Sequence, residues 1–181
     1  MKFTPAKIEG AWIVEQQRHV DDRGFFARSW CQAEFTDHGL NPDLVQCNVS
    51  FNRNRGTVRG MHFQTAPFEE AKLVRCTSGA IQDVIVDLRP DSRTYLNTFS
   101  VLIDAAEGNA LYVPEGCAHG FQTLEDDTEV LYQMTREYHA ESARGFRWND
   151  SAVRIEWPLS ISVISEKDLV FPDLVLQRAV A

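Results

Sequence analysis

The sequence has no hydrophobic run that approaches the roughly 20 residues a helix needs to span a bilayer. It also has no block of like charges, no internal repeat and no low-complexity segment. The N-terminal MKFTPAKIEGAW lacks the apolar core of a signal peptide. These absences argue against helical membrane proteins, repeat proteins and disordered chains. They predict one globular domain, residues 1–181, in the cytoplasm.

Positive charge is scarce, and lysine especially so. The net charge is −8 at pH 7, from 18 Lys and Arg against 26 Asp and Glu. A broad surface for nucleic acid or an anionic membrane is therefore not expected. A local basic pocket is still compatible with this charge, and Arg23, Arg53, Arg55 and Arg59 are candidates for holding a phosphorylated small molecule.

Cysteine is also rare, with four residues and no CxxC pair. Cys31, Cys47, Cys76 and Cys117 are widely spaced, and three of them sit within apolar patterns. Buried free thiols in a reducing compartment are expected rather than disulfides.

What the sequence does contain is short runs rich in Val, Ile, Phe and Tyr, separated by turn signals such as DDRG, NRG and PEG. This rhythm predicts an all-β sandwich or barrel. Only AEFTDHG, with Gly39 at its C-terminal end, and SEKD at 165–168 look helical. The expected strands are GFFARSW, LVQCNVSF, KLVRC, AIQDVIVDL, TFSVLI, ALYV and EVLYQMT.

Alternation along these strands puts polar and apolar side chains on the same face. Such mixed faces indicate a barrel whose interior is a ligand pocket. The sets that share a face are Gln46, Asn48 and Ser50; Lys72, Val74 and Cys76; and Ile81, Asp83, Ile85 and Asp87.

Two histidines stand in comparable settings, His62 in RGMHFQ and His119 in VPEGCAHGFQ. The turn formed by Pro114, Gly116 and His119 resembles the second motif of cupin barrels. Metal-binding cupins carry another histidine two residues after the first, where this chain has Gln64. Two histidines without a clear third ligand make a poor transition-metal site. No metal is therefore predicted.

Without a metal, His62 can act as a base, and a carboxylate would hold its tautomer. The residues alone leave three carboxylates open for this role, Asp83, Asp87 and Asp168. If Lys72 faces the same cavity, its charge can stabilise a developing oxyanion.

Tyr132 could supply a phenolic proton from another wall of the cavity. Base, cation and phenol together suit proton removal next to a carbonyl followed by reprotonation. The simpler alternative is that Lys72 only pairs with Glu69 or Glu70 and that Tyr132 only packs.

Seven motifs follow one another along the chain: RGMHFQ, KLVRC, DVIVDLR, LYVPEGCAHGFQ, EVLYQMTREY, RGFRWND and ISEKD. In this order they resemble the motifs of the RmlC family, the dTDP-4-dehydrorhamnose 3,5-epimerases. Further upstream, DDRGFF and VQCNVSFNRNRGTVRG do so as well. The resemblance implies a cupin-type jelly roll (a double-stranded β-helix barrel) with a few short peripheral helices, in a homodimer without metal or organic cofactor.

The resemblance also implies roles on a nucleotide-linked 4-keto-6-deoxy sugar. His62 would remove the proton next to the keto group with Asp168 as its partner, and Lys72 would stabilise the enolate. Tyr132 would protonate the opposite face. Asp83 and His119 match further active-site positions, where they would orient Lys72 and the sugar.

Nucleotide binding is implied for a separate set of positions. Arg23 and the strand with Phe25 and Phe26 would come from the partner subunit, so that the N-terminal strands complete the partner's site. The positions implied to hold the base or diphosphate are Arg23, Phe26, Gln46, Asn48, Arg59 and Tyr138.

Three positions depart from the family pattern. Arg28 stands where the family usually has Glu, on the nucleotide-facing strand, so it is expected either to alter which nucleotide is held or to point outward. Gln133 replaces a common Lys, and His139 stands where a second tyrosine is frequent. The proton chemistry is thus preserved while the binding rim varies.

The predicted reaction is conversion of dTDP-4-dehydro-6-deoxy-D-glucose to dTDP-4-dehydro-L-rhamnose by inversion at C3 and C5. The main alternative is a CDP- or GDP-linked 4-keto sugar, or inversion at one carbon only. A sugar 3,4-ketoisomerase, a metal-dependent cupin oxygenase and a non-catalytic nucleotide-sugar-binding cupin are weaker alternatives.

Overall fold

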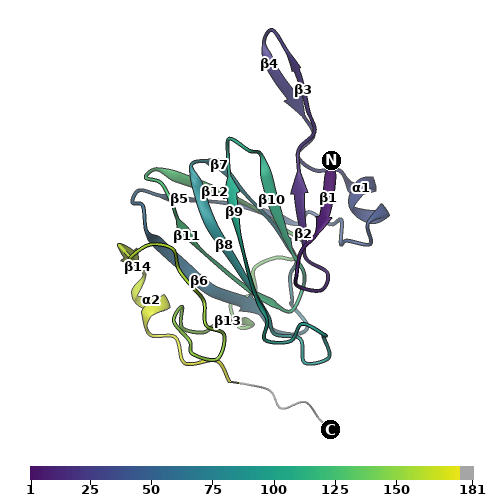
Figure 1. Cartoon of the computed structure of the whole chain (residues 1–181). Coiled ribbons are helices and arrows are strands. Elements are labelled where there is room, and N and C mark those ends of the chain that lie inside the picture. Colours follow the sequence, from purple (N-terminus) through teal and green to yellow (C-terminus); the bar gives the residue numbers. More distant parts are fainter. Residues whose placement is uncertain (176–181) are drawn as a thin grey trace.

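Two β-sheets face each other across an apolar core in the computed structural model, which describes residues 1–175 (Figure 1). The first sheet runs, in spatial order, β1 (Lys2–Pro5), β2 (Trp12–Glu15), β10 (Asn109–Val113), β7 (Lys72–Ser78), β12 (Thr128–Met134) and β5 (Gln46–Asn52). The second runs β13 (Ala143–Gly145), β6 (Thr57–Gln64), β11 (Cys117–Thr123), β8 (Ala80–Asp87) and β9 (Thr98–Asp104). Apart from β14 (Val163–Ile164), which pairs in parallel with β6, neighbouring strands are antiparallel. The predicted all-β jelly roll is confirmed.

Strand alternation builds the core between the sheets. From β7, Val74 and Cys76 point inward and meet Ile81 and Ile85 of β8 and Phe121 of β11. These side chains are at most 6% exposed, so their burial supplies the main hydrophobic stabilisation. The face-sharing predicted for the β7 and β8 residues is therefore present.

Two short helices lie outside the sheets. α1 (Gln32–Asp37) covers the outer face of the first sheet through Phe35, and Gly39 follows it with φ +69°, as predicted for the residue that ends this helix. α2 (Glu166–Leu169) begins after Ser165, whose hydroxyl accepts a hydrogen bond from the Asp168 N–H at 3.1 Å. α2 lies beside β6 (Figure 1), and the Asp168 carboxylate accepts a hydrogen bond from the Gly60 N–H of that strand.

A hairpin of β3 (Arg18–Asp21) and β4 (Gly24–Ala27) forms a sheet of its own and stands away from the two main sheets (Figure 1). Val20 and Phe26 on it are 78% and 77% exposed. Large apolar side chains on an isolated hairpin are unusual for a chain that functions alone.

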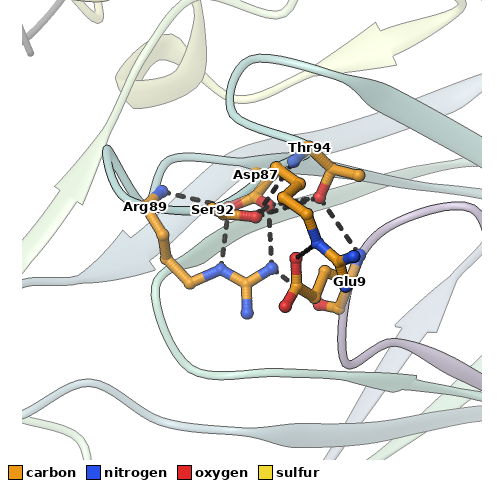
Figure 2. A network of polar contacts seen from close by, with 6 residues as sticks. Glu9, Asp87, Arg89, Ser92 and Thr94 are labelled. Atoms are coloured by element: carbon orange, nitrogen blue, oxygen red, sulfur yellow. Dashed lines mark hydrogen bonds and ion pairs between the residues drawn. The ribbon is translucent and has the colours of Figure 1, made fainter.

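The end of β8 is fixed by a polar network around Asp87 (Figure 2). The Arg89 guanidinium donates two hydrogen bonds of 2.8 Å to the Asp87 carboxylate, and the Ser92 and Thr94 hydroxyls each donate one of 2.6 Å. Arg89 also donates to the carbonyl of Glu9, so the network fastens the β1–β2 turn to the loop after β8. Although full burial raises the pKa of Asp87, these donors outweigh it and lower that pKa to about 2.

The cysteines form no disulfide among the described residues. Cys76 and Cys117 are buried as predicted, and burial raises the pKa of each thiol to about 12. Cys47 is exposed and Cys31 half-buried, which differs from the prediction of buried thiols. Cys47 lies on β5, an edge strand of the first sheet, and Cys31 is the residue before α1. Within residues 1–175, no helix is long and apolar enough to cross a membrane.

Candidate active site

A cavity of about 320 Å³ opens between the two sheets at one end of the barrel. Its walls come from β5 and β12 on one side and from β6 and β11 on the other, with Lys72 of β7 deeper in. The lining includes Asn48, Ser50, Arg59, His62, Gln64, Glu70, Lys72, His119, Phe121, Tyr132, Met134, Tyr138, Arg144 and Lys167.

His62 faces this cavity from β6 with 42% of its side chain exposed. Its Nε2 lies 2.7 Å from Asp168 Oδ1, and Asp168 is almost fully buried behind it. Burial acts to raise the pKa of Asp168, but the hydrogen bond and charge of His62, with a bond from the Gly60 N–H, lower it overall. Asp168 is thus held ionised against the imidazole, and the other ring nitrogen is left to face a ligand.

The local shape of β6 brings His62 to this position. The register between β6 and β11 shifts around Gly60, which has φ +129°. A methyl group at Gly60 would lie 2.6 Å from the Cα of Gly120, so the two strands touch here through glycine alone. The same shift turns the Gly60 N–H toward Asp168 Oδ2, at 3.4 Å.

A second imidazole–carboxylate pair lies on the neighbouring strands. His119 Nε2 is 2.6 Å from Asp83 Oδ1, and both side chains are buried. Asp83 Oδ2 has no hydrogen-bond partner in the described part of the chain. The resemblance implied that Asp83 and His119 orient Lys72 and the sugar, but here Asp83 is paired with His119.

Lys72 is paired with a different carboxylate. Its Nζ lies 2.9 Å from Glu70 Oε1, and the side chains of Lys72 and Glu70 are only 10% and 5% exposed. Lys72 also lines the cavity, so it has a local acidic partner and faces the site as well.

Tyr132 approaches from β12, in the sheet opposite His62. Its ring packs edge-on against His119 at 6.0 Å between centroids. Burial, reinforced by the negative charge of Asp83, raises the pKa of the Tyr132 phenol, which keeps it protonated.

The predicted binding residues divide into two groups. Asn48, Arg59 and Tyr138 line the cavity, and the side chain of Gln46 accepts a hydrogen bond from the Tyr138 N–H at 3.1 Å. Arg23, Phe26 and Arg28 lie on or just after the β3–β4 hairpin and do not line it. Within one chain, Arg23 pairs with Asp21 and Arg28 with Glu34.

Two other predicted positions lie elsewhere. Asp87 belongs to the network described above, which removes it from the candidate partners of His62. His139 stacks on Phe68 with parallel rings 3.7 Å apart and is not part of the cavity wall.

Some lining residues were missed by the sequence reasoning. Arg144 and Lys167 add positive charge at the cavity, and Phe171 packs edge-on against the His62 ring. Arg144 and Lys167 lie inside the motifs RGFRWND and ISEKD, so proximity to motif residues was the available signal. Nothing in the spacing indicated that Gln64, at the position of a metal ligand in other cupins, is buried in a hydrogen-bond network.

Residues 1–175 contain no group of three or more His, Cys, Asp or Glu side chains arranged to hold a metal ion. The residues that the cavity gathers include an imidazole paired with a carboxylate, a lysine and a neutral phenol.

Comparison with known proteins gives a consistent picture. Residues 5–175 match the family model described as dTDP-4-dehydrorhamnose 3,5-epimerase. A protein of that name from Sinorhizobium fredii is 42% identical, over 96% of this chain and 90% of its own. The crystal structure of a dTDP-4-dehydrorhamnose 3,5-epimerase from Bacillus anthracis, with TDP and PPi bound, has a TM-score of 0.92 at 39% identity, covering 96% of this chain and 99% of its own.

A third relative has a different printed activity. The structure of ChmJ from Streptomyces bikiniensis, described as a 3'-monoepimerase in complex with dTDP-quinovose, has a TM-score of 0.86 at 31% identity. It covers 93% of this chain and 86% of its own length. The same fold therefore occurs with inversion at one carbon as well as at two.

Proposed function

Since the chain belongs to the family of dTDP-4-dehydrorhamnose 3,5-epimerases, we propose that it inverts C3 and C5 of dTDP-4-dehydro-6-deoxy-D-glucose to give dTDP-4-dehydro-L-rhamnose. The chain is an enzyme of the isomerase class, and its substrate is a nucleotide sugar. The observation that carries the mechanism is the His62–Asp168 pair, in one cavity with Lys72 and Tyr132.

Proton removal is assigned to His62. The 4-keto group acidifies the C–H bonds at C3 and C5, so one base can act on each carbon in turn. Asp168 holds the imidazole through Nε2 and stabilises the imidazolium that forms when the other nitrogen takes the proton. The C–H electron pair becomes the double bond of an enolate, and the negative charge moves to O4.

Lys72 is assigned to that oxygen. Its ammonium group lies in a largely buried part of the cavity, where a fixed charge acts more strongly than it would in water. Stabilising O4 lowers the barrier for both carbons, because O4 carries the charge in both enolates.

Tyr132 is assigned to reprotonation. It stands on the sheet opposite His62, so a sugar between the sheets would lose a proton to one wall and gain one from the other. The raised pKa keeps the phenol neutral and ready to donate. Proton return from the opposite face inverts the carbon, and no oxidant or reductant is needed. Water would then return a proton to the Tyr132 phenolate and take one from the His62 imidazolium, which resets both groups for the other carbon.

The nucleotide is assigned to the open end of the cavity, where Asn48, Arg59 and Tyr138 lie. Arg144 and Lys167 add positive charge that suits a diphosphate. Binding energy from the nucleotide, remote from the reacting carbons, would hold the sugar in place.

A homodimer is part of the proposal. The β3–β4 hairpin carries Arg23, Phe25 and Phe26 away from its own cavity, with its apolar side chains exposed. Val49 and Phe51 on the edge strand β5 are also more than half exposed. Pairing of two chains would cover these surfaces and bring the hairpin of each to the other's site.

Incubation in D2O tests the reaction and its substrate. The enzyme is mixed separately with the dTDP-, CDP- and GDP-linked 4-keto-6-deoxyglucose, and deuterium at each carbon is followed by NMR. Deuterium at both C3 and C5 of the dTDP sugar supports the proposal. Label at C3 alone would favour the monoepimerase reaction of ChmJ, and label only in the CDP or GDP sugar would shift the nucleotide specificity. A cytoplasmic location stays a prediction.

A further inference from the structure

We propose that Glu70 is a positioning residue for the reaction, fixing the ammonium group of Lys72 where the substrate O4 becomes an oxyanion. This inference rests on the proposed epimerase function. Glu70 acts through Lys72 and need not touch the sugar. The arrangement of Gln64, Glu70 and Lys72 carries the inference.

Lys72 needs a partner to have a defined position. Its backbone is fixed at the start of β7, where it pairs with Val113 and Met134 on the two neighbouring strands. The four-carbon side chain is flexible, and a lysine ammonium is a point charge without preferred directions. The 2.9 Å contact with Glu70 Oε1 is the one ion pair that Lys72 makes in the described part of the chain.

Glu70 is itself fixed from the other side. Its second oxygen, Oε2, accepts a hydrogen bond from Gln64 Nε2 at 3.0 Å. One carboxylate oxygen therefore points at Lys72 and the other at Gln64, which defines the plane of the carboxylate. This second, buried contact satisfies the carboxylate and also fixes its orientation toward Lys72.

Gln64 is anchored in turn to the backbone. Its Nε2 donates to the Phe68 carbonyl at 2.8 Å, and its Oε1 accepts from the His139 N–H at 2.6 Å. The same Nε2 also donates to the Glu137 carbonyl at 3.2 Å. The contacts with Glu137 and His139 lie on either side of Tyr138, which lines the cavity where the nucleotide is proposed to bind. The chain of contacts thus runs from the rim of the site to the reacting end.

Replacing Glu70 with glutamine tests whether its carboxylate positions Lys72 or only fills space, because the two side chains have nearly the same shape. In Glu70→Gln the amide can accept from Lys72 with its oxygen, but its NH2 then faces the donor Nε2 of Gln64. Either the lysine contact or the glutamine contact must break. We expect kcat to fall roughly 10- to 100-fold because a displaced cation stabilises O4 poorly.

A lower kcat with an unchanged KM would identify Glu70 as a positioning residue. KM and dTDP affinity should stay at their wild-type values, because the oxyanion is absent from the bound substrate and forms only on the way to the enolate. The rates of deuterium incorporation at C3 and C5 should fall by the same factor, since both enolates place their charge on O4. Glu70→Asp keeps the carboxylate one methylene back and should recover part of kcat.

Glu69→Gln is the matched control. Glu69 is the preceding residue, and it lines a separate cavity beside Leu88 and Pro90. This variant removes the same charge one position away and should retain wild-type kcat. Thermal unfolding and dTDP binding show whether each variant is folded.

A double-mutant cycle tests whether Glu70 acts through Lys72. In a Lys72→Met background, measured by long incubations in D2O, Glu70→Gln should cause no further loss. Losses that multiply in the double variant would overturn the inference, as would a wild-type kcat in Glu70→Gln. If the wild-type enzyme exchanges no proton of any 4-keto nucleotide sugar, the proposed function itself fails, which is a different result.

Discussion

His62 and His119 lie directly opposite each other on the neighbouring strands β6 and β11, and each bonds through Nε2 to a different buried aspartate. The two pairs differ in access to the cavity. The side chain of His62 is 42% exposed, whereas that of His119 is 5% exposed. Both histidines line the cavity, and the greater exposure of His62 supports the proposal that it, and not His119, is the base.

Replacing His62 with alanine should remove the base. We expect deuterium incorporation at C3 and C5 to fall by roughly 10²- to 10⁴-fold, the usual contribution of a general base. The side chain is half-exposed, so the melting temperature and dTDP affinity should change little. NMR in D2O measures the exchange, and near-normal exchange in this variant would show that another group is the base.

Asp168→Asn should leave His62 in place but in the wrong tautomer or without its counter-charge. A fall in kcat of roughly 10²- to 10⁴-fold is expected from the corresponding change in other histidine–carboxylate pairs. Asp83→Asn is the comparison variant, because it alters the less accessible pair. Equal losses of exchange in the two variants would contradict the assignment of His62 as the only base.

Tyr132→Phe should uncouple exchange from inversion. His62 can still remove a proton and return a deuteron to the same face, so label should enter while L-sugar formation slows. The two outcomes are read together from proton couplings of the product. Loss of exchange and inversion in equal measure would show that Tyr132 is needed before the enolate forms.

The pH dependence should carry no signature of Tyr132 in the ordinary tyrosine range. Because burial and the charge of Asp83 raise its pKa above the usual value of 10.0, this phenol stays protonated throughout that range. Profiles of the proton-exchange rate of the wild type and Tyr132→Phe, extended above pH 10, check this. An alkaline loss of activity near the usual tyrosine value that Tyr132→Phe abolishes would contradict it.

Asp87 should contribute to stability and not to catalysis. Its pKa is lowered from 3.8 to about 2, so folding favours the ionised form. The contribution is complete above the unfolded-state value and is lost as the pH falls through the folded value. Asp87→Asn should therefore lower the free energy of unfolding by about 2 kcal/mol at pH 7. The difference from wild type should shrink between pH 4 and pH 2.

Denaturant unfolding at several pH values measures that difference, and kcat at saturating substrate serves as the control. A constant gap across the acid range would mean that the carboxylate charge is not what stabilises this loop.

The fold was predictable where hydrophobic alternation was strong. KLVRC and AIQDVIVDL became β7 and β8, with the predicted residues facing inward. The strands TVRGMHFQ and CAHGFQT were not predicted, because glycine and polar residues hide their alternation. The glycines allow the close approach of the two strands at Gly60 and Gly120, and the polar residues include side chains that line the cavity.

The site was predictable in its residue types but not in its pairings. His62, Lys72 and Tyr132 were selected for their chemistry, yet the residues alone left three aspartates open for His62. The choice depends on α2, which reaches β6 from more than a hundred residues away in the chain. The Lys72–Glu70 pair is local, but whether Lys72 also faces the cavity depends on which sheet lies opposite.

The isolated β3–β4 hairpin has a consequence for how the enzyme would be assayed (Figure 1). If each subunit completes its partner's nucleotide site, a lone chain keeps its base, lysine and tyrosine but lacks part of its grip on the nucleotide. Dilution below the dissociation constant of the dimer would then raise the apparent KM and leave kcat at saturation intact. Specific activity at low substrate would depend on the concentration of the enzyme itself.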